Sequence, residues 1–298
     1  MVAAFKCFNM GRKVSFKDMK KIGFVDYYIS EWHANNYPLW IDKVCKKLGY
    51  DYKVCYAYAE KYDSSYDGRN TDKWCEDFGV EKCNTIKELC DKSDFVIVLA
   101  PSNPETHVRL CQEAFQAGKR CYVDKTFAED YKSAKAIFDC ADKYGVKFFS
   151  TSALRYADEL QSYKNEKRIS VKGGGSNFDE YIIHQIEMAV RVIGTGAVSA
   201  VAENTEQGIK VQISYPDDRA ATLLFDSRYD FEADVTDKSG KTTHQKIESS
   251  FFDTLIEKII LFFETGNVDF DTNDTLEVIK IREGAILAKN NIGKKIEF

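Results

Sequence analysis

The sequence predicts an α/β protein: a Rossmann-type doubly wound parallel sheet, then an α+β domain with a largely antiparallel sheet. Up to about residue 150, short apolar runs alternate with amphipathic helical stretches, which is typical of βαβ units. Beyond residue 154, apolar and polar residues alternate within each run, as in strands with one buried face. The length of 298 residues suits two ordinary cores. We therefore expect a dinucleotide-binding domain in residues 1–150 and an α+β substrate and oligomerisation domain in residues 151–298.

The elements of the first half follow from these runs and from the residues that end them. The predicted strands are 21–25, 52–60, 94–100, 119–124 and 146–154. The predicted helices are 30–48, 71–78, 85–92, 105–117 and 131–144. Gly118 and Gly145 each end a helix, as glycines in a left-handed conformation commonly do. Pro38, preceded by Asn35 and Asn36, predicts a break in the first helix.

The second half reads as one helix, a series of strands and two further helices. The helices are predicted at 179–193, 251–264 and 274–289. The strands are predicted at 198–204, 208–216, 220–227, 229–237 and 243–249, with a short last strand in the closing KKIEF. Hairpin turns are expected at 216–220 and 237–241. An antiparallel sheet with helices on one face leaves its other face open, so we expect a homodimer or a higher homo-oligomer.

Composition excludes several classes of function. Lys and Arg total 42 against 47 Asp and Glu, a net charge of −5 that does not favour a nucleic-acid partner. No apolar stretch reaches the ~18 to 20 residues of a membrane span, and Lys and Arg interrupt the short apolar patches of residues 1–21. We expect a cytoplasmic protein with no membrane partner, whose first twenty residues add nothing to the sheet.

The nine cysteines are odd in number, contain no C-x-x-C pair and all precede residue 141. This pattern predicts reduced, mostly buried thiols and neither a disulfide framework nor a metal site.

In an open α/β sheet, ligands bind outside the carboxyl ends of the strands. After the first strand, a dinucleotide site requires glycines that let the diphosphate approach the helix N-terminus. This chain has Asp26, Tyr28, Ile29 and Ser30 there instead. A carboxylate and phenol rings would crowd and repel a diphosphate, whereas the structural alternative for Asp26 is a helix cap.

The next two strand ends carry further candidates. Glu60 could accept hydrogen bonds from the ribose hydroxyls, which favours NAD over NADP, or it could simply be solvated. Pro101 and Asn103 could border the nicotinamide ribose, or could only shape the turn.

The fourth strand ends in Asp124 and Lys125. A lysine at this edge could donate a proton or anchor a substrate, and the alternative is an ion pair with Asp124. Arg155, after the fifth strand, adds a fixed cation near the same edge.

In the second half, Glu180 and His184 are i, i+4 neighbours on one helix face, and Glu187 follows a turn later. A histidine between acids could be a tuned general acid or base, or a purely structural residue. A zinc site at Glu180 and His184 lacks further ligands, so no metal is expected.

These segments resemble the Gfo/Idh/MocA oxidoreductases, a family that includes glucose-fructose oxidoreductase and inositol 2-dehydrogenase. The stretch SDFVIVLAPSNPETHVRLCQEAFQAGKRCYVDKTF is similar to the family's strand, Pro/Asn turn, helix and Glu-Lys-Pro segment, with Asp124, Lys125 and Thr126 in the last motif. EYIIHQIE is similar to its D-x-x-x-H-x-x-D helix, with His184 at the catalytic histidine. The resemblance implies that Lys125 lies near the nicotinamide and the substrate hydroxyl.

On this basis we predict an NAD(P)-dependent oxidoreductase that moves a hydride to or from a sugar, a polyol or a related hydroxylated compound. His184 would act as general base, Lys125 would orient the hydroxyl oxygen, and Glu180 would hold the imidazole or contact the substrate. The predicted cofactor-binding residues are Asp26, Tyr28, Ile29, Ser30, Glu60, Pro101, Asn103, Asp124, Lys125 and Arg155.

Two alternatives remain open. Because Asp26, Tyr28 and Ser30 replace the glycines, the chain could be a non-catalytic scaffold or sensor that has lost normal dinucleotide binding. It could also use Lys125 and His184 for lyase or isomerase chemistry, with a tightly held nucleotide.

Overall fold

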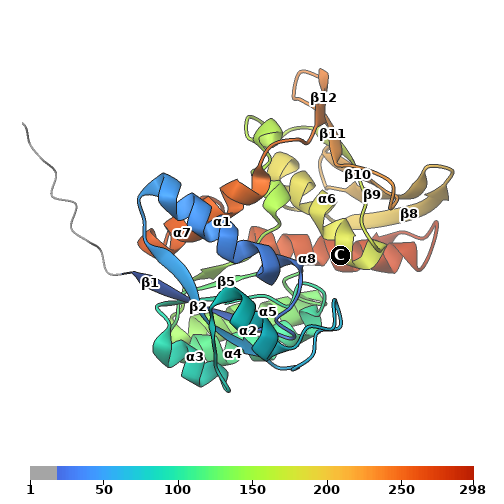
Figure 1. Ribbon diagram of the computed structural model, residues 1–298. Coiled ribbons are helices and arrows are strands. Elements are labelled where there is room, and N and C mark those ends of the chain that lie inside the picture. Colours follow the sequence, from blue (N-terminus) through green and yellow to red (C-terminus); the bar gives the residue numbers. More distant parts are fainter. Residues whose placement is uncertain (1–18) are drawn as a thin grey trace, which may run out of the picture.

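The computed structural model describes residues 19–298 and contains two β-sheets (Figure 1). The first sheet is parallel throughout, with strand order β3-β2-β1-β4-β5-β6. Its strands are β1 (Lys20–Asp26), β2 (Tyr52–Ala59), β3 (Glu81–Lys82), β4 (Phe95–Val98), β5 (Cys121–Val123) and β6 (Phe148–Phe149). This order is that of a doubly wound dinucleotide-binding sheet, so the predicted fold class of the first half is confirmed.

Helices cover both faces of this sheet. They are α1 (Trp32–Leu48), α2 (Thr71–Phe78), α3 (Ile86–Lys92), α4 (His107–Gln116) and α5 (Tyr131–Tyr144). Ile22 and Phe24 of β1 face the core shared with α1, while Val25 faces the core shared with α3, α4 and α5. Alternate residues of one buried parallel strand therefore serve two separate cores.

The predicted break of the first helix is wrong, because α1 runs through Pro38 without interruption. Pro38 lacks the N–H that would bond to the Ala34 carbonyl, which removes one helical hydrogen bond. Tyr37 and Ile41 on either side of it are almost fully buried against the sheet. The burial of this face outweighs the missing bond and keeps the helix continuous.

The second sheet has strand order β12-β11-β7-β10-β9-β8-β13 and is antiparallel except where β10 pairs with β7. Its strands are β7 (Arg168–Gly173), β8 (Ser199–Thr205), β9 (Gly208–Ser214), β10 (Ala220–Phe225), β11 (Glu232–Thr236), β12 (Thr242–Lys246) and β13 (Ile296–Glu297). The mostly antiparallel second sheet confirms the predicted class. The interior strand β7 was not predicted, although buried Ile169 and Val171 alternate with more exposed polar residues there.

Three helices complete the chain: α6 (Phe178–Ile193), α7 (Phe251–Thr265) and α8 (Asp274–Lys289). α6 packs on β7 and β10, and α8 packs on β8 and β9. α7 follows the second sheet in sequence but returns to the first sheet, where Leu255 and Ile256 pack with α1 (Figure 1). The return of α7 brings segments from both ends of the chain beside the carboxyl edge of the first sheet.

Several strands are shorter than predicted, among them two of the first sheet. The run 94–100 contains β4 over Phe95–Val98, and the run 146–154 contains β6 over Phe148–Phe149 only. The Ser152 hydroxyl accepts the Leu154 N–H and starts a 3₁₀ turn over Ala153–Tyr156, which ends the extended backbone there.

The eight described cysteines are unpaired thiols, and burial raises the pKa of Cys45, Cys75, Cys83 and Cys90 to about 11. Within residues 19–298, no helix is both long enough and apolar enough to cross a membrane. The expectations for Cys7 and for the remainder of residues 1–18 lie outside the described part of the chain.

Candidate active site

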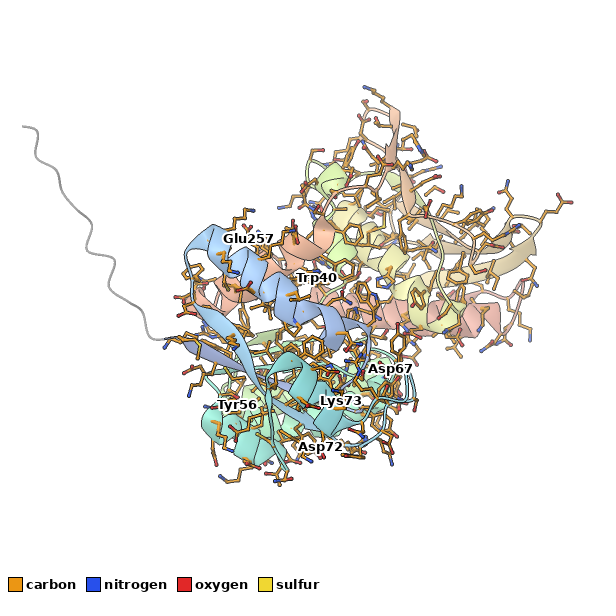
Figure 2. The ribbon with its side chains drawn as sticks, in the orientation of Figure 1. Trp40, Tyr56, Asp67, Asp72, Lys73 and Glu257 are labelled. Atoms are coloured by element: carbon orange, nitrogen blue, oxygen red, sulfur yellow. The ribbon has the colours of Figure 1, made fainter. Side chains whose placement is uncertain are left out.

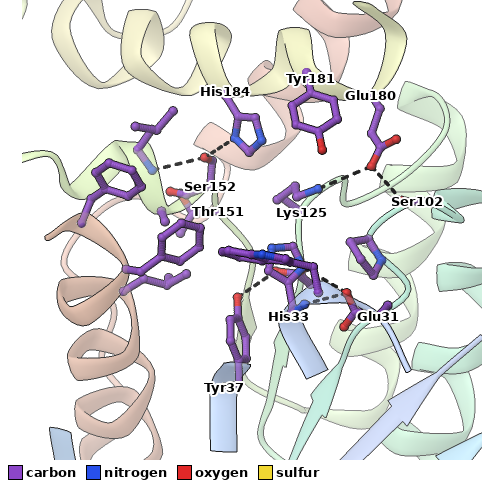
Figure 3. Close-up of a pocket in the computed structure, with 18 of the residues that line it drawn as sticks. Glu31, His33, Tyr37, Ser102, Lys125, Thr151, Ser152, Glu180, Tyr181 and His184 are labelled. Carbon is purple, nitrogen blue, oxygen red and sulfur yellow. Dashed lines mark hydrogen bonds and ion pairs between the residues drawn. The ribbon is translucent and has the colours of Figure 1, made fainter. Parts of the chain in front are cut away.

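A cavity of about 340 Å³ lies at the carboxyl ends of β1, β4 and β5, where α6 and α7 approach the first sheet (Figure 3). It has the size of a pocket for a small organic molecule. Six of the predicted site residues line it: Tyr28, Pro101, Asp124, Lys125, Glu180 and His184. The topology therefore brings strand ends far apart in sequence and helix α6 to one cavity.

Lys125 is nearly buried, with 7% of its surface exposed, and its ammonium lies in the cavity wall. Its Nζ is 3.9 Å from Oε1 of Glu180 and lies over the ring of Tyr181. The Ser102 hydroxyl donates to the same Oε1 at 2.7 Å, which fixes the carboxylate. Because Glu180 balances the charge without closing on Nζ, the ammonium can still donate hydrogen bonds to a ligand in the cavity.

His184 comes from α6 and lines the same cavity (Figure 3). Its Nδ1 is 2.7 Å from the Ser152 hydroxyl, so Nε2 is the ring nitrogen left for the cavity. Burial lowers the pKa of His184 well below its usual value, and the positive charge of Lys125 lowers it further. The imidazole is therefore neutral at pH 7 and can exchange a proton with a bound hydroxyl group.

A third polar group on the cavity wall was not predicted. The Nδ1 of His33, near the start of α1, lies 2.8 Å from Oδ2 of Asp124. The Tyr37 hydroxyl donates to the other oxygen of Asp124 at 3.3 Å. Burial alone would raise the pKa of Asp124, but His33 and Lys125 together lower it below its usual value. His33 and Tyr37 are i, i+4 neighbours just after the first strand, a pattern that could have indicated this group.

The turn between β1 and α1 is occupied by buried acids. Asp26 is 1% exposed, and its Oδ1 accepts the N–H groups of Tyr27 and Ala100. Glu31 is 4% exposed and caps α1, its two carboxylate oxygens accepting the N–H groups of His33 and Ala34. Burial raises the pKa of both carboxyl groups, and the negative charge of Glu31 raises that of Asp26 further.

The helix cap expected of Asp26 is thus supplied by Glu31. Ile29 is buried in the core, and Tyr28 contributes to the cavity wall. The Ser30 hydroxyl donates to Asp67, which lies in the loop after β2. Asn103 donates to Glu105 beside the turn that it was expected to shape.

Two further predicted residues lie away from the cavity. Glu60 is held by Arg109, whose Nε and Nη2 donate to the carboxylate at 2.8 Å each. Arg155 is 2% exposed and donates to Glu187 at 2.8 Å and to Asp274 at 3.0 Å. Arg155 is not among the residues that line the cavity, and its charge is balanced inside the protein.

The contacts of Glu31 and Glu60 show whether the residues at this edge of the sheet fit a dinucleotide. A bound diphosphate would take the backbone N–H groups at the N-terminus of α1, which already bond to the Glu31 carboxylate. The Glu60 carboxylate, expected to hold the ribose, is engaged by Arg109. The residues of the β1–α1 turn therefore do not fit a diphosphate in the usual place, whereas the cavity at Lys125 and His184 fits a small ligand.

Sequence comparison supports the resemblance for one part of the chain. Residues 64–152 match the model of the Gfo/Idh/MocA family, described as an oxidoreductase family with an NAD-binding Rossmann fold. The matched segment contains Pro101 and Lys125; the β1–α1 turn and His184 lie outside it. No curated protein matches the sequence significantly.

Solved structures share the fold over nearly the whole chain. GenD2 from gentamicin A biosynthesis, in complex with NAD, has a TM-score of 0.73 at 12% identity and covers 97% of this chain and 99% of its own. Myo-inositol 2-dehydrogenase from Lactobacillus plantarum has a TM-score of 0.70 at 14% identity, covering 94% and 99%. Aldose-aldose oxidoreductase from Caulobacter crescentus, complexed with glycerol, has a TM-score of 0.68 at 12% identity, covering 94% and 100%. The resemblance to the Gfo/Idh/MocA oxidoreductases is therefore confirmed, in sequence for residues 64–152 and in fold for the described chain.

Proposed function

We propose that the cavity binds a sugar, a polyol or a related hydroxylated compound, and that Lys125 and His184 move the proton of its hydroxyl group. The observation that carries this proposal is that a nearly buried ammonium and a neutral imidazole line the same small cavity. An oxidoreductase acting on CH–OH groups requires such a proton transfer, and the family model and the fold neighbours belong to that class.

In this proposal, each residue has a distinct part. The ammonium of Lys125 donates a hydrogen bond to the substrate oxygen and stabilises the negative charge that develops on it. The His184 imidazole takes or returns the proton through Nε2, since Nδ1 is held by Ser152. Glu180 positions the Lys125 ammonium and is itself held by Ser102.

The walls of the cavity suit the carbon faces of such a ligand. Tyr181, Phe231, Trp32 and Phe252 line it, and the rings of Trp32 and Phe252 are 5.1 Å apart. Aromatic rings with a few convergent polar groups are typical of a site for a small organic ligand.

NAD or NADP, expected from the sequence, would supply the hydride acceptor or donor of an oxidoreductase. The residues of this chain account for the hydroxyl proton only, and oxidation of the substrate would also require such a dinucleotide to take the hydride. The β1–α1 turn does not fit its diphosphate. The second candidate is a non-catalytic scaffold or sensor with the same ligand, and the cap formed by Glu31 favours it.

Binding and turnover of a panel of hydroxylated compounds test the proposal. Thermal unfolding of the full chain with glycerol, inositols, aldoses and sugar acids should reveal a ligand that raises the Tm. His184→Ala and Lys125→Ala should weaken that shift, while His244→Ala, an exposed histidine of β12, should not. Binding with no turnover when NAD or NADP is added would select the sensor. If no compound in the panel binds, or if the two cavity variants bind as well as the wild type, the proposal is wrong.

A homodimer remains a separate proposal, based on the open face of the second sheet. α6 and α8 both pack on the other face. Lys210 and Gln212 of β9 and Thr222 of β10 lie on the open face. Light scattering of the purified chain should give twice the mass of 34.1 kDa. A monomer at that mass would contradict the proposal.

A further inference from the structure

The N-terminus of α1 already holds an anion, and that anion belongs to the chain. α1 is 17 residues long, and a helix of that length attracts negative charge at its first turn. The Glu31 carboxylate accepts the N–H of His33 at 2.7 Å and also the N–H of Ala34. Glu31 is 4% exposed, so its carboxylate lies inside the protein at the place where a diphosphate would meet the helix.

The charge around this carboxylate disfavours a second anion. Asp26 and Asp124 are each 1% exposed, and both act electrostatically on Glu31. The cationic partners of this acidic group are His33, when it is protonated, and Lys125, which lowers the pKa of Asp124. A diphosphate placed here would add two negative charges to three buried carboxyl groups.

The loop after β2 closes the same edge of the sheet. The Ser30 hydroxyl donates to Asp67 at 2.7 Å, and the Ser64 hydroxyl donates to the carbonyl oxygen of Ser30. Backbone N–H groups of Glu60 and Lys61 donate to the carbonyls of Asp26 and Tyr27. In Figure 2, Asp67 lies beneath the beginning of α1. The loop residues Ser64 and Asp67 are thus bonded to Ser30, directly before the helix end that a diphosphate would approach.

We propose that this chain has no open diphosphate site: Glu31 fills the anion position at α1, and the cavity receives one small ligand between His33, Lys125 and His184. The inference concerns the edge of the sheet and does not depend on which hydroxylated compound binds. It departs from what the family model and the NAD-bound neighbour suggest for this position.

The presence of Glu31 in the place of a diphosphate also affects the cavity. With the Glu31 carboxylate at the first turn of α1, the His33 side chain lines the cavity, and its Nδ1 lies 2.8 Å from Oδ2 of Asp124. A ligand there meets an additional imidazole whose Nε2 can donate or accept a hydrogen bond, depending on its proton. His33 thus becomes a ligand-binding residue in the space next to the closed turn.

The first test uses ADP-ribose, which carries the adenosine and diphosphate of a dinucleotide without the nicotinamide. Thermal unfolding of the wild-type full chain at about 1 mM ADP-ribose should show no change in Tm. Binding with a Kd of about 10 µM would raise the Tm by roughly 5 °C, and a saturable rise of that size would overturn the inference.

The second test removes the carboxylate from the helix end. Glu31→Ser keeps a residue that can cap a helix, and inorganic pyrophosphate should then bind at least tenfold more tightly than to the wild type. The matched control is Asp130→Ser, the same change at the N-cap of α5, which should leave pyrophosphate affinity unchanged. Equal affinity of Glu31→Ser and the wild type, or an equal gain in the control, would show that Glu31 does not close the site.

Discussion

Two parts of the carboxyl edge of the first sheet differ in how their polar groups are satisfied. We call the β1–α1 turn the closed end and the part near β5 and α6 the open end. At the β1–α1 turn, Glu31 and Ser30 bond to neighbouring parts of the same chain. Near β5 and α6, the closest carboxylate to Lys125 is 3.9 Å away, and His184 keeps one ring nitrogen toward the cavity. The same scaffold thus keeps groups available for a ligand at one end and satisfies them internally at the other.

This difference shows how proteins that share one sheet topology can bind different ligands. The strand order and the two cores determine where strand ends meet, and they do not depend on the residues of the turns. A few side chains then decide which part of the edge receives a ligand.

The largest expected effect is at the open end. His184→Ala should weaken binding of an accepted hydroxylated ligand by about 10- to 100-fold or more, because it removes a hydrogen-bonding group from the cavity wall. Calorimetric titration measures the loss, and thermal unfolding should show that the fold is retained. His244→Ala, whose exposed ring pairs with Asp234, is the control and should bind the ligand normally. Unchanged affinity in His184→Ala would contradict the role of His184.

Arg155→Met tests a residue that the sequence placed in the site and the structure places in an ion-pair cluster. The change leaves Glu187, 2% exposed, without its cation, so the free energy of unfolding should fall by about 3–5 kcal/mol. Urea denaturation measures this loss. Arg228→Met, which breaks an exposed pair with Asp226, should have little effect. The ligand affinity of the folded Arg155 variant should equal that of the wild type. Weaker ligand binding by a variant whose stability is unchanged would show that Arg155 belongs to the ligand site.

His33→Asn tests the boundary between the two ends. It removes the imidazole that faces the cavity next to the capped turn, and ligand affinity should fall by about 10- to 100-fold, the value of one hydrogen bond to a charged or polarised group. Calorimetric titration with the ligand found in the panel measures the change. Wild-type affinity in this variant would show that the ligand does not reach the closed end.

Asp26→Asn should have the smallest effect on the protein at a single pH. It tests the buried acids through the pH dependence of the stability. The pKa of Asp26 is raised in the folded protein, so its protonated form stabilises the fold at low pH. This stability is lost as the pH rises from the unfolded value near 3.9 through the folded pKa. Asn stays neutral, so the variant should gain stability relative to the wild type as the pH rises above about 4. Parallel Tm profiles of the two proteins would contradict the raised pKa.

Much of the fold could be predicted from the sequence because its signals are local. The apolar run in β4 and the glycines that follow α4 and α5 are each recognisable within a few residues. The continuous helix through Pro38 depends on burial of Tyr37 and Ile41 against distant strands, and no local pattern shows that burial.

The site could be predicted only in part for the same reason. Lys125, Glu180 and His184 follow recognisable motifs and do line one cavity. The role of Glu31 depends on the exact residue at which α1 begins, and that of His33 on its contact with Asp124, 91 positions away in the sequence. The first residue of a helix is the feature that hydrophobic periodicity predicts least precisely. Long-range polar contacts produce no periodic pattern in the sequence.

The central claim is that the substrate end of this fold is open while the diphosphate end is filled by the chain itself. Calorimetric titration of the wild-type full chain with NADH tests it most directly, because NADH would have to use both ends at once. We predict no saturable heat at concentrations where the hydroxylated ligand binds. One-to-one binding of NADH with a micromolar Kd would contradict the account.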